Sequence, residues 1–249
     1  MQKKRSVSAT VIILGSMGLC AQKQIDHQSL YWIRYYNQLS LDARLNWSNE
    51  IEDRRFLHNS RQHHLILHSR LHYKLNKNTD LGLGFTYSLQ SPQDPESLST
   101  LIVPEKRIVQ EINLINPLSK RFNLSHRWRI DERFIHKNNG KALIPGDDFN
   151  FRFRYKLQCT YQLNKINSSQ PTTIKIADEI MINAGKAIVY NTFDQNRISC
   201  SIEQRFTQAL SAELGYIHWY QQRSSGYQFY SRDIIRFTLY HKINLKPSA

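Results

Sequence analysis

The feature that most constrains the fold is an unbroken alternation of apolar and polar residues from Phe149 to Leu163. Odd positions are aromatic, aliphatic or Cys, and even positions are polar or charged. Only a β-strand places alternate side chains on opposite faces. This stretch would form a strand of about 50 Å, whereas strands of globular proteins usually have about 3–10 residues. It therefore predicts an unusually long strand with an apolar face and a cationic face.

Similar alternation recurs along most of the chain. The clearest further segments are 41–55, 63–75, 81–90, 122–134 and 197–206, and less regular ones are 107–116, 173–183, 210–222 and 232–245. Asp178 lies on the apolar parity of its segment, which predicts a bulge or a register change there. The pattern as a whole predicts an all-β chain.

Alternation does not decide which face points inward, because a soluble sandwich or lipocalin-like barrel buries the apolar face and a membrane barrel exposes it. The strands are long enough for the roughly 9–11 tilted residues that cross a bilayer, and the polar faces carry charges of both signs. Short links near 76–79, 116–121 and 207–210 alternate with long ones at 91–106, 136–147, 184–196 and 223–231. These features favour an antiparallel transmembrane β-barrel with short periplasmic turns and longer external loops. A soluble exported β protein is the weaker alternative.

The strand count is predicted to be ten to twelve. Taking 41–55 as the first strand gives ten, with both termini on the periplasmic side, and leaves the aromatic segment 30–39 without an assigned place. Ten or twelve is favoured over eleven, because bacterial single-chain barrels have even counts.

Residues 1–21 have the pattern of a cleaved secretory signal peptide. Three basic residues at positions 3–5 precede an apolar core, Val11 to Leu19, and Cys20-Ala21 supplies small residues for cleavage. Lipidation of Cys20 is disfavoured, because Leu19 stands where a small residue is needed. The sequence thus predicts export, a single domain over 22–249 and location in the outer membrane.

The formal net charge is +14, from 34 Lys and Arg against 20 Asp and Glu. The cations are spread along alternating segments instead of clustering in a known motif, which argues against a nucleic-acid partner. The predicted partners are outer-membrane lipid, the barrel assembly machinery during insertion and small anionic solutes.

The polar faces predict a charged barrel interior, or lumen. The candidate lumen-lining residues are Glu52, Arg54, Arg127, Arg129, Asp131, Arg133, Arg152, Arg154, Lys156, Glu203 and Arg205. If neighbouring strands pair, the inward cations lie about 5–8 Å apart and need acids or anions to neutralise them. Two interpretations follow: an ion-paired plug that fills a narrow barrel, or an anion-attracting pocket or passage.

No metal or cofactor is predicted. His64, His68 and His72 repeat every four residues, but on a strand such neighbours are about 13 Å apart, too far to share an ion. Cys159 and Cys200 are separated by one predicted strand, about 10 Å, which is too far for a disulfide. We expect two free thiols on the apolar face.

No catalytic residue is assigned. A His-x-Ser at His58-Asn59-Ser60 falls in a predicted loop, and Asp147-Asp148 with His136 faintly resembles the acids and His of barrel proteases. Such groups must lie within hydrogen-bond reach of one another, which spacing alone cannot show. A barrel enzyme acting on lipid or surface polymer therefore stands as the alternative function.

Several loose motifs carry a family resemblance. They are Trp32-Ile33-Arg34-Tyr35 and an acidic-Arg-Phe ending seen in Glu52–Phe56, His126–Phe134 and Glu203–Phe206. Over roughly residues 29–245 the chain resembles the domain-of-unknown-function 2490 family of predicted Bacteroidota outer-membrane β-barrel proteins. That resemblance implies an outer-membrane barrel with no established activity.

Overall fold

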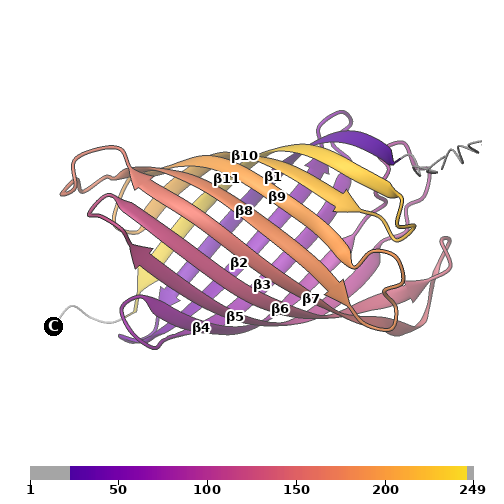
Figure 1. The fold of residues 1–249 in the computed structure, drawn as a ribbon, viewed down its shortest axis with the longest axis horizontal. Coiled ribbons are helices and arrows are strands. Elements are labelled where there is room, and N and C mark those ends of the chain that lie inside the picture. The colour runs from indigo at the N-terminus through magenta and orange to yellow at the C-terminus, as the bar shows by residue number, and fades with distance from the viewer. Residues whose placement is uncertain (1–22, 246–249) are drawn as a thin grey trace, which may run out of the picture.

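The computed structural model describes residues 23–245 as a closed barrel of eleven strands (Figure 1). The predicted signal peptide, residues 1–21, lies outside the described residues. The strands are β1 (Gln24–Ser40), β2 (Leu45–Phe56), β3 (Gln62–Lys74), β4 (Thr79–Gln90), β5 (Val103–Pro117), β6 (Phe122–Asn138), β7 (Leu143–Gln162), β8 (Thr172–Ala184), β9 (Phe193–Arg205), β10 (Leu210–Gln222) and β11 (Gln228–Asn244). The all-β class and the barrel are confirmed.

In residues 23–245 there is no helix with the length and apolarity needed to cross a membrane.

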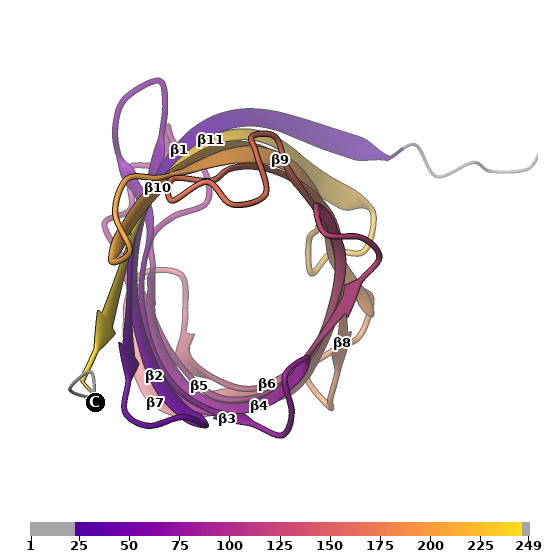
Figure 2. The same ribbon diagram turned by 90° about the vertical axis from the view of Figure 1, so that its left-hand side faces the viewer.

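The barrel closes through a parallel pair, and the preference for an even strand count is wrong. Segment 30–39 belongs to β1, which pairs antiparallel with β2 and parallel with β11 (Figure 2). Parallel pairing runs from Gln24 opposite Gln228 to Ser40 opposite Asn244. All the other neighbouring strands are antiparallel. Because the strands alternate in direction and their number is odd, the first and the last strand run in the same direction where they meet.

The odd count also places the two ends of the described chain at opposite ends of the barrel, which corrects the prediction of a shared side (Figure 1). The end at which β1 starts, called the loop end here, carries links 57–61, 91–102, 139–142, 185–192 and 223–227. The turn end carries 41–44, 75–78, 118–121, 163–171 and 206–209. The predicted long loop 136–147 is mostly strand, because β6 and β7 continue as a projecting hairpin whose residues 141–149 are exposed (Figure 1).

The apolar face points outward and the charged face points inward. Leu214 is 55% exposed while the adjacent Glu213 is 2% exposed, and Ile180 is 40% exposed while Glu179 is 7% exposed. This is the reverse of a water-soluble β-barrel, whose apolar side chains fill the core. The described barrel is therefore not arranged like a lipocalin, whose apolar faces point inward.

The expected irregularity at Asp178 is wrong. Asp178 stays in register opposite Leu157 on β7 and Ile198 on β9, and the shift between β8 and β9 falls instead between Met181 and Ile182. The Asp178 carboxylate is exposed on the outer wall and accepts a 2.6 Å hydrogen bond from Asn196 Nδ2. The hydrogen bond from Asn196 on the next strand lets Asp178 stay in register without a bulge.

Two glycines on the inward face of β4 leave room for side chains that cross the interior. A Cβ at Gly84 would collide with the Ser69 carbonyl oxygen and with Cγ and Cα of Arg70. A Cβ at Gly82 would come within 2.6 Å of Cγ of Glu111, which belongs to a flexible side chain.

We therefore expect Gly84→Ala to destabilise the barrel by about 1–3 kcal/mol, the usual cost of overpacking. Gly82→Ala is the matched control and should cost less, since its main neighbour can move. Urea unfolding of the refolded protein in detergent, followed by Trp fluorescence, measures both. Equal stability of Gly84→Ala and the unaltered protein would contradict the packing.

Candidate functional site

The barrel interior contains a cavity of about 720 Å³ toward the loop end. Thirteen Arg and Lys residues line it, against six Asp and Glu. A second cavity of about 440 Å³ lies toward the turn end. Five residues line both cavities and therefore lie between them. We call this group the waist: Arg34, Glu50, Arg70, Arg127 and Lys156.

Most of the candidate lumen residues lie around the larger cavity. Those lining it are Glu52, Arg54, Arg127, Arg129, Arg133, Arg152, Arg154 and Lys156. Asp131 is fully buried in the wall behind them. Glu203 and Arg205 are not among the lining residues: the Glu203 carboxylate binds Lys175 Nζ at 2.6 Å and accepts a bond from Ser211, while Arg205 is exposed at the end of β9.

The pairing of β6 with β7 sets like charges opposite one another. Lys156 lies opposite Arg127, and Arg154 opposite Arg129. Directly opposed like charges destabilise a sheet, so the wall needs acids nearby. Asp131 supplies one, with 2.5 Å to Arg129 Nε and 3.4 Å to Arg154 Nη1.

The second acid of this wall comes from β8. Glu179 Oε1 accepts hydrogen bonds from Arg127 Nη2 at 2.7 Å and from Arg154 Nη2 at 2.8 Å. A carboxylate shared by two guanidinium groups leaves each of them only partly neutralised. The wall formed by β6, β7 and β8 is thus ion-paired and still cationic.

One of the two fully buried acids, Glu105, was missed by the sequence reasoning. Glu105 is 0% exposed and accepts hydrogen bonds from Arg107 Nε at 2.7 Å and Arg133 Nε at 2.5 Å, and from Gln90. Glu105 shares the parity of Arg107 on β5, but it lies two residues before the predicted segment 107–116. The Glu50 and Glu213 carboxylates, which bind Arg34 and Arg236 respectively, were missed as well.

Three buried or half-buried inward cations form no ion pair with a carboxylate in the part of the chain that the structure describes. Lys156 Nζ donates to Gln158 Oε1 at 2.8 Å, and Arg197 Nη2 donates to Gln195 Oε1 at 3.4 Å. Arg232 donates only to glutamine side chains, those of Gln28, Gln221 and Gln93. These cations are solvated by neutral groups, so their charge is not cancelled.

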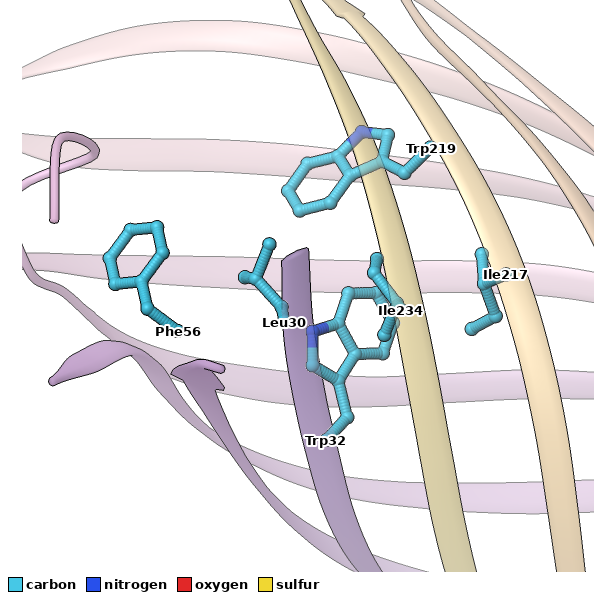
Figure 3. Packing of buried hydrophobic residues seen from close by; sticks show 6 residues of the cluster. All are labelled: Leu30, Trp32, Phe56, Ile217, Trp219 and Ile234. Carbon is cyan, nitrogen blue, oxygen red and sulfur yellow. The ribbon is translucent and has the colours of Figure 1, made fainter. Parts of the chain in front are cut away.

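A cluster of buried apolar residues lies on the inner wall of β1, β10 and β11, joined by Phe56 from β2 (Figure 3). Its members are Leu30, Trp32, Phe56, Ile217, Trp219 and Ile234. The cationic carbon of Arg54 lies 3.8 Å from the Trp32 ring centre, and those of Arg197 and Arg232 lie 4.6 and 4.5 Å from the Trp219 ring centre. Cation–π contacts of this kind contribute about 0.5–2 kcal/mol and partly offset the free-energy cost of removing the guanidinium groups from water.

The histidines of β3 have separate partners, as the strand geometry predicts. His68 Nε2 lies 3.2 Å from Glu50, and His72 Nδ1 lies 3.1 Å from Asp80. His64 Nδ1 lies 2.7 Å from Nδ1 of His63, which sits in the bulge between β2 and β3. Within residues 23–245, no three or more His, Cys, Asp or Glu side chains come together in a group that could hold a metal ion.

Cys159 and Cys200 are free thiols, as expected. Ile176 of β8 lies between them in register, opposite Cys159 on one side and Cys200 on the other. Cys200 is exposed and Cys159 is partly exposed, both on the outward parity.

The residues considered for catalysis form one contact. His136 Nδ1 lies 2.9 Å from Asp147, at the base of the projecting hairpin, and both are more than a third exposed. Asp148 instead lies 3.7 Å from Lys137. In the link 57–61, Asn59 donates to the Pro95 carbonyl and Ser60 adopts a left-handed backbone with φ of 56°.

The molecule is thus a closed β-barrel with an apolar outer wall and a charged interior. The model of a protein family of unknown function (DUF2490) matches residues 30–230, from β1 to the start of β11, and the chain belongs to this family. No curated protein matches the sequence.

Proposed function

We propose that the protein is an outer-membrane β-barrel whose interior attracts small anions and passes them between its two ends. The outward apolar residues support the membrane setting, because an apolar band around a polar interior is the pattern of membrane barrels. Insertion would follow export through a cleaved signal peptide and would use the barrel assembly machinery.

The excess of cations around the cavity is the observation that carries the anion preference. Thirteen basic residues face six acidic ones there. Low-dielectric walls focus the field of such charges and raise the local concentration of counter-ions. Rings of Arg and Lys are the usual means by which pores select anions.

The waist is the section that a solute must cross between the two cavities. It holds four cations, Arg34, Arg70, Arg127 and Lys156, around a single carboxylate, Glu50. Lys156 is the one of these four with no carboxylate partner in residues 23–245, since Arg34 and Arg70 bind Glu50 and Arg127 binds Glu179. Its charge is therefore the most available to a passing anion.

Planar-bilayer recordings in a KCl gradient test this function. We expect a reversal potential displaced toward the chloride equilibrium potential, and we expect Lys156→Glu to reduce or invert that displacement. Lys106→Glu, on the exposed outer parity of β5, is the control and should leave the reversal potential unchanged. Cation selectivity, or silence from barrels shown to be inserted, would overturn the proposal.

A further inference from the structure

We infer that the larger cavity holds a specific site for a small multivalent oxyanion, built from Arg127, Arg154, Lys156 and Arg197 around Glu179. This inference rests on the proposed function and adds the chemical class of the solute. The group of five residues is called the Glu179 cluster below.

The charges of the Glu179 cluster do not balance. Arg127 and Arg154 both donate to Oε1 of Glu179, while Lys156 on β7 and Arg197 on β9 lie directly opposite Glu179 in register. Four cations thus surround one anion. Asp131 neutralises Arg154 only weakly, because its carboxylate lies 3.4 Å from Arg154 Nη1 and only 2.5 Å from Arg129 Nε.

Buried donors without acceptors point to a missing partner. Within residues 23–245, five guanidinium nitrogens are buried and have no hydrogen-bond partner: Nε of Arg70, Arg127, Arg197 and Arg236, and Nη2 of Arg129. All five side chains line the same cavity. An unmade hydrogen bond at a buried group is destabilising, and more so when the group is charged.

A multivalent oxyanion matches this arrangement better than a halide does. Its several oxygens accept several N–H groups at once, and planar guanidinium groups bind phosphoryl and carboxylate oxygens through two parallel bonds. Two or more negative charges would also neutralise the excess around Glu179. A volume of about 720 Å³ lies within the usual range of small-molecule sites.

The guanidinium group of Arg197 is held in place by two tryptophan rings. Its guanidinium carbon lies 4.6 Å from the Trp219 ring centre and 5.4 Å from that of Trp32. Those rings restrict how the planar group can turn while its Nε has no acceptor among the described residues. A guanidinium held in this way is pre-organised for an incoming anion.

The test is calorimetric titration of the full-length protein in zwitterionic detergent at constant ionic strength, with pyrophosphate and citrate as separate probes and chloride as the monovalent comparison. We expect saturable binding of pyrophosphate, citrate or both, and no saturable binding of chloride. Arg197→Gln and Lys156→Gln should each weaken binding about tenfold, the effect of losing one charge-assisted contact. Neither substitution removes the ion-pair partner of a carboxylate within the described chain, so both variants should fold.

Lys106→Gln is the matched control, because Lys106 is also a cation but lies on the exposed outer parity of β5 and does not line the cavity. Its affinity for the probes should stay unchanged. Absence of saturable binding, or equal binding by all three variants, would overturn the inference. If anion-selective conductance persisted in that case, only the specific site would fail; if anion selectivity were absent too, the proposed function would fail with it.

Discussion

Glu105→Gln is expected to destabilise the barrel by about 3–5 kcal/mol, the cost of removing one partner of a buried ion pair. Glu105 is fully buried between Arg107 and Arg133 and also accepts a bond from Gln90. A neutral amide of the same shape leaves two inward guanidinium groups without their shared counter-charge. Such a loss is a large fraction of the usual net stability of a folded domain, about 5–15 kcal/mol.

Glu203→Gln is the matched control for this prediction. Glu203 is also an inward-parity glutamate bound to a cation, Lys175, but it is only half-buried and Lys175 keeps Glu213 as a second partner at 2.6 Å. We expect a loss below about 1 kcal/mol, as for exposed ion pairs. Urea unfolding in detergent compares the two variants, and equal losses would show that the buried triad is not a principal stabilising element.

Leu214→Arg is expected to impair insertion into lipid. Leu214 is 55% exposed on the outer wall, in register with Ile202 and Phe237, which are 45% and 44% exposed. In lipid, an Arg on this face costs up to about 2–4 kcal/mol near the bilayer midplane. In water the same exposed substitution would be nearly neutral, within about 0.5 kcal/mol.

The comparison for this variant is Tyr190→Arg, in the link 185–192 at the loop end, where Tyr190 is 69% exposed. It should fold into lipid vesicles with the yield of the unaltered protein, whereas Leu214→Arg should fold with a markedly lower yield. Indistinguishable yields for the two variants would mean that the outer wall does not face lipid.

The strands could be predicted because alternation is a local property of the sequence. Residues 149–162 fall within β7, which ends one residue before Leu163, and 122–134 fall within β6, each with the expected faces. Segment 30–39 was harder to place because β1 carries aromatic residues on both faces: Trp32 is buried inside, whereas Tyr35 is exposed outside.

Closure could not be predicted, because it depends on which distant strands meet. Nothing in the alternation of 30–39 or 232–245 states that these segments pair in parallel, and the even-count rule pointed the other way. The turn residues could set the register only between consecutive strands.

The parity of each segment indicated which charged residues point inward, but not which residues they pair with. The sequence placed Arg154 and Asp131 on inward faces, yet the sharing of Glu179 by Arg127 and Arg154 depends on the register across three strands. The contact between Arg197 and Trp219 likewise joins β9 and β10 through side chains long enough to reach along the wall. Parity therefore predicts which side chains point inward, but it does not predict the contacts that long, flexible side chains make with other strands.

We propose that the apolar outer wall lies in the lipid of the outer membrane around a charged interior. Fractionation of expressing cells, followed by gel electrophoresis of boiled and unboiled samples in SDS, tests it most directly. We predict that the protein is in the outer-membrane fraction and that boiling changes its mobility, as the closed barrel opens. Recovery as a soluble periplasmic protein with the same mobility before and after boiling would contradict the claim.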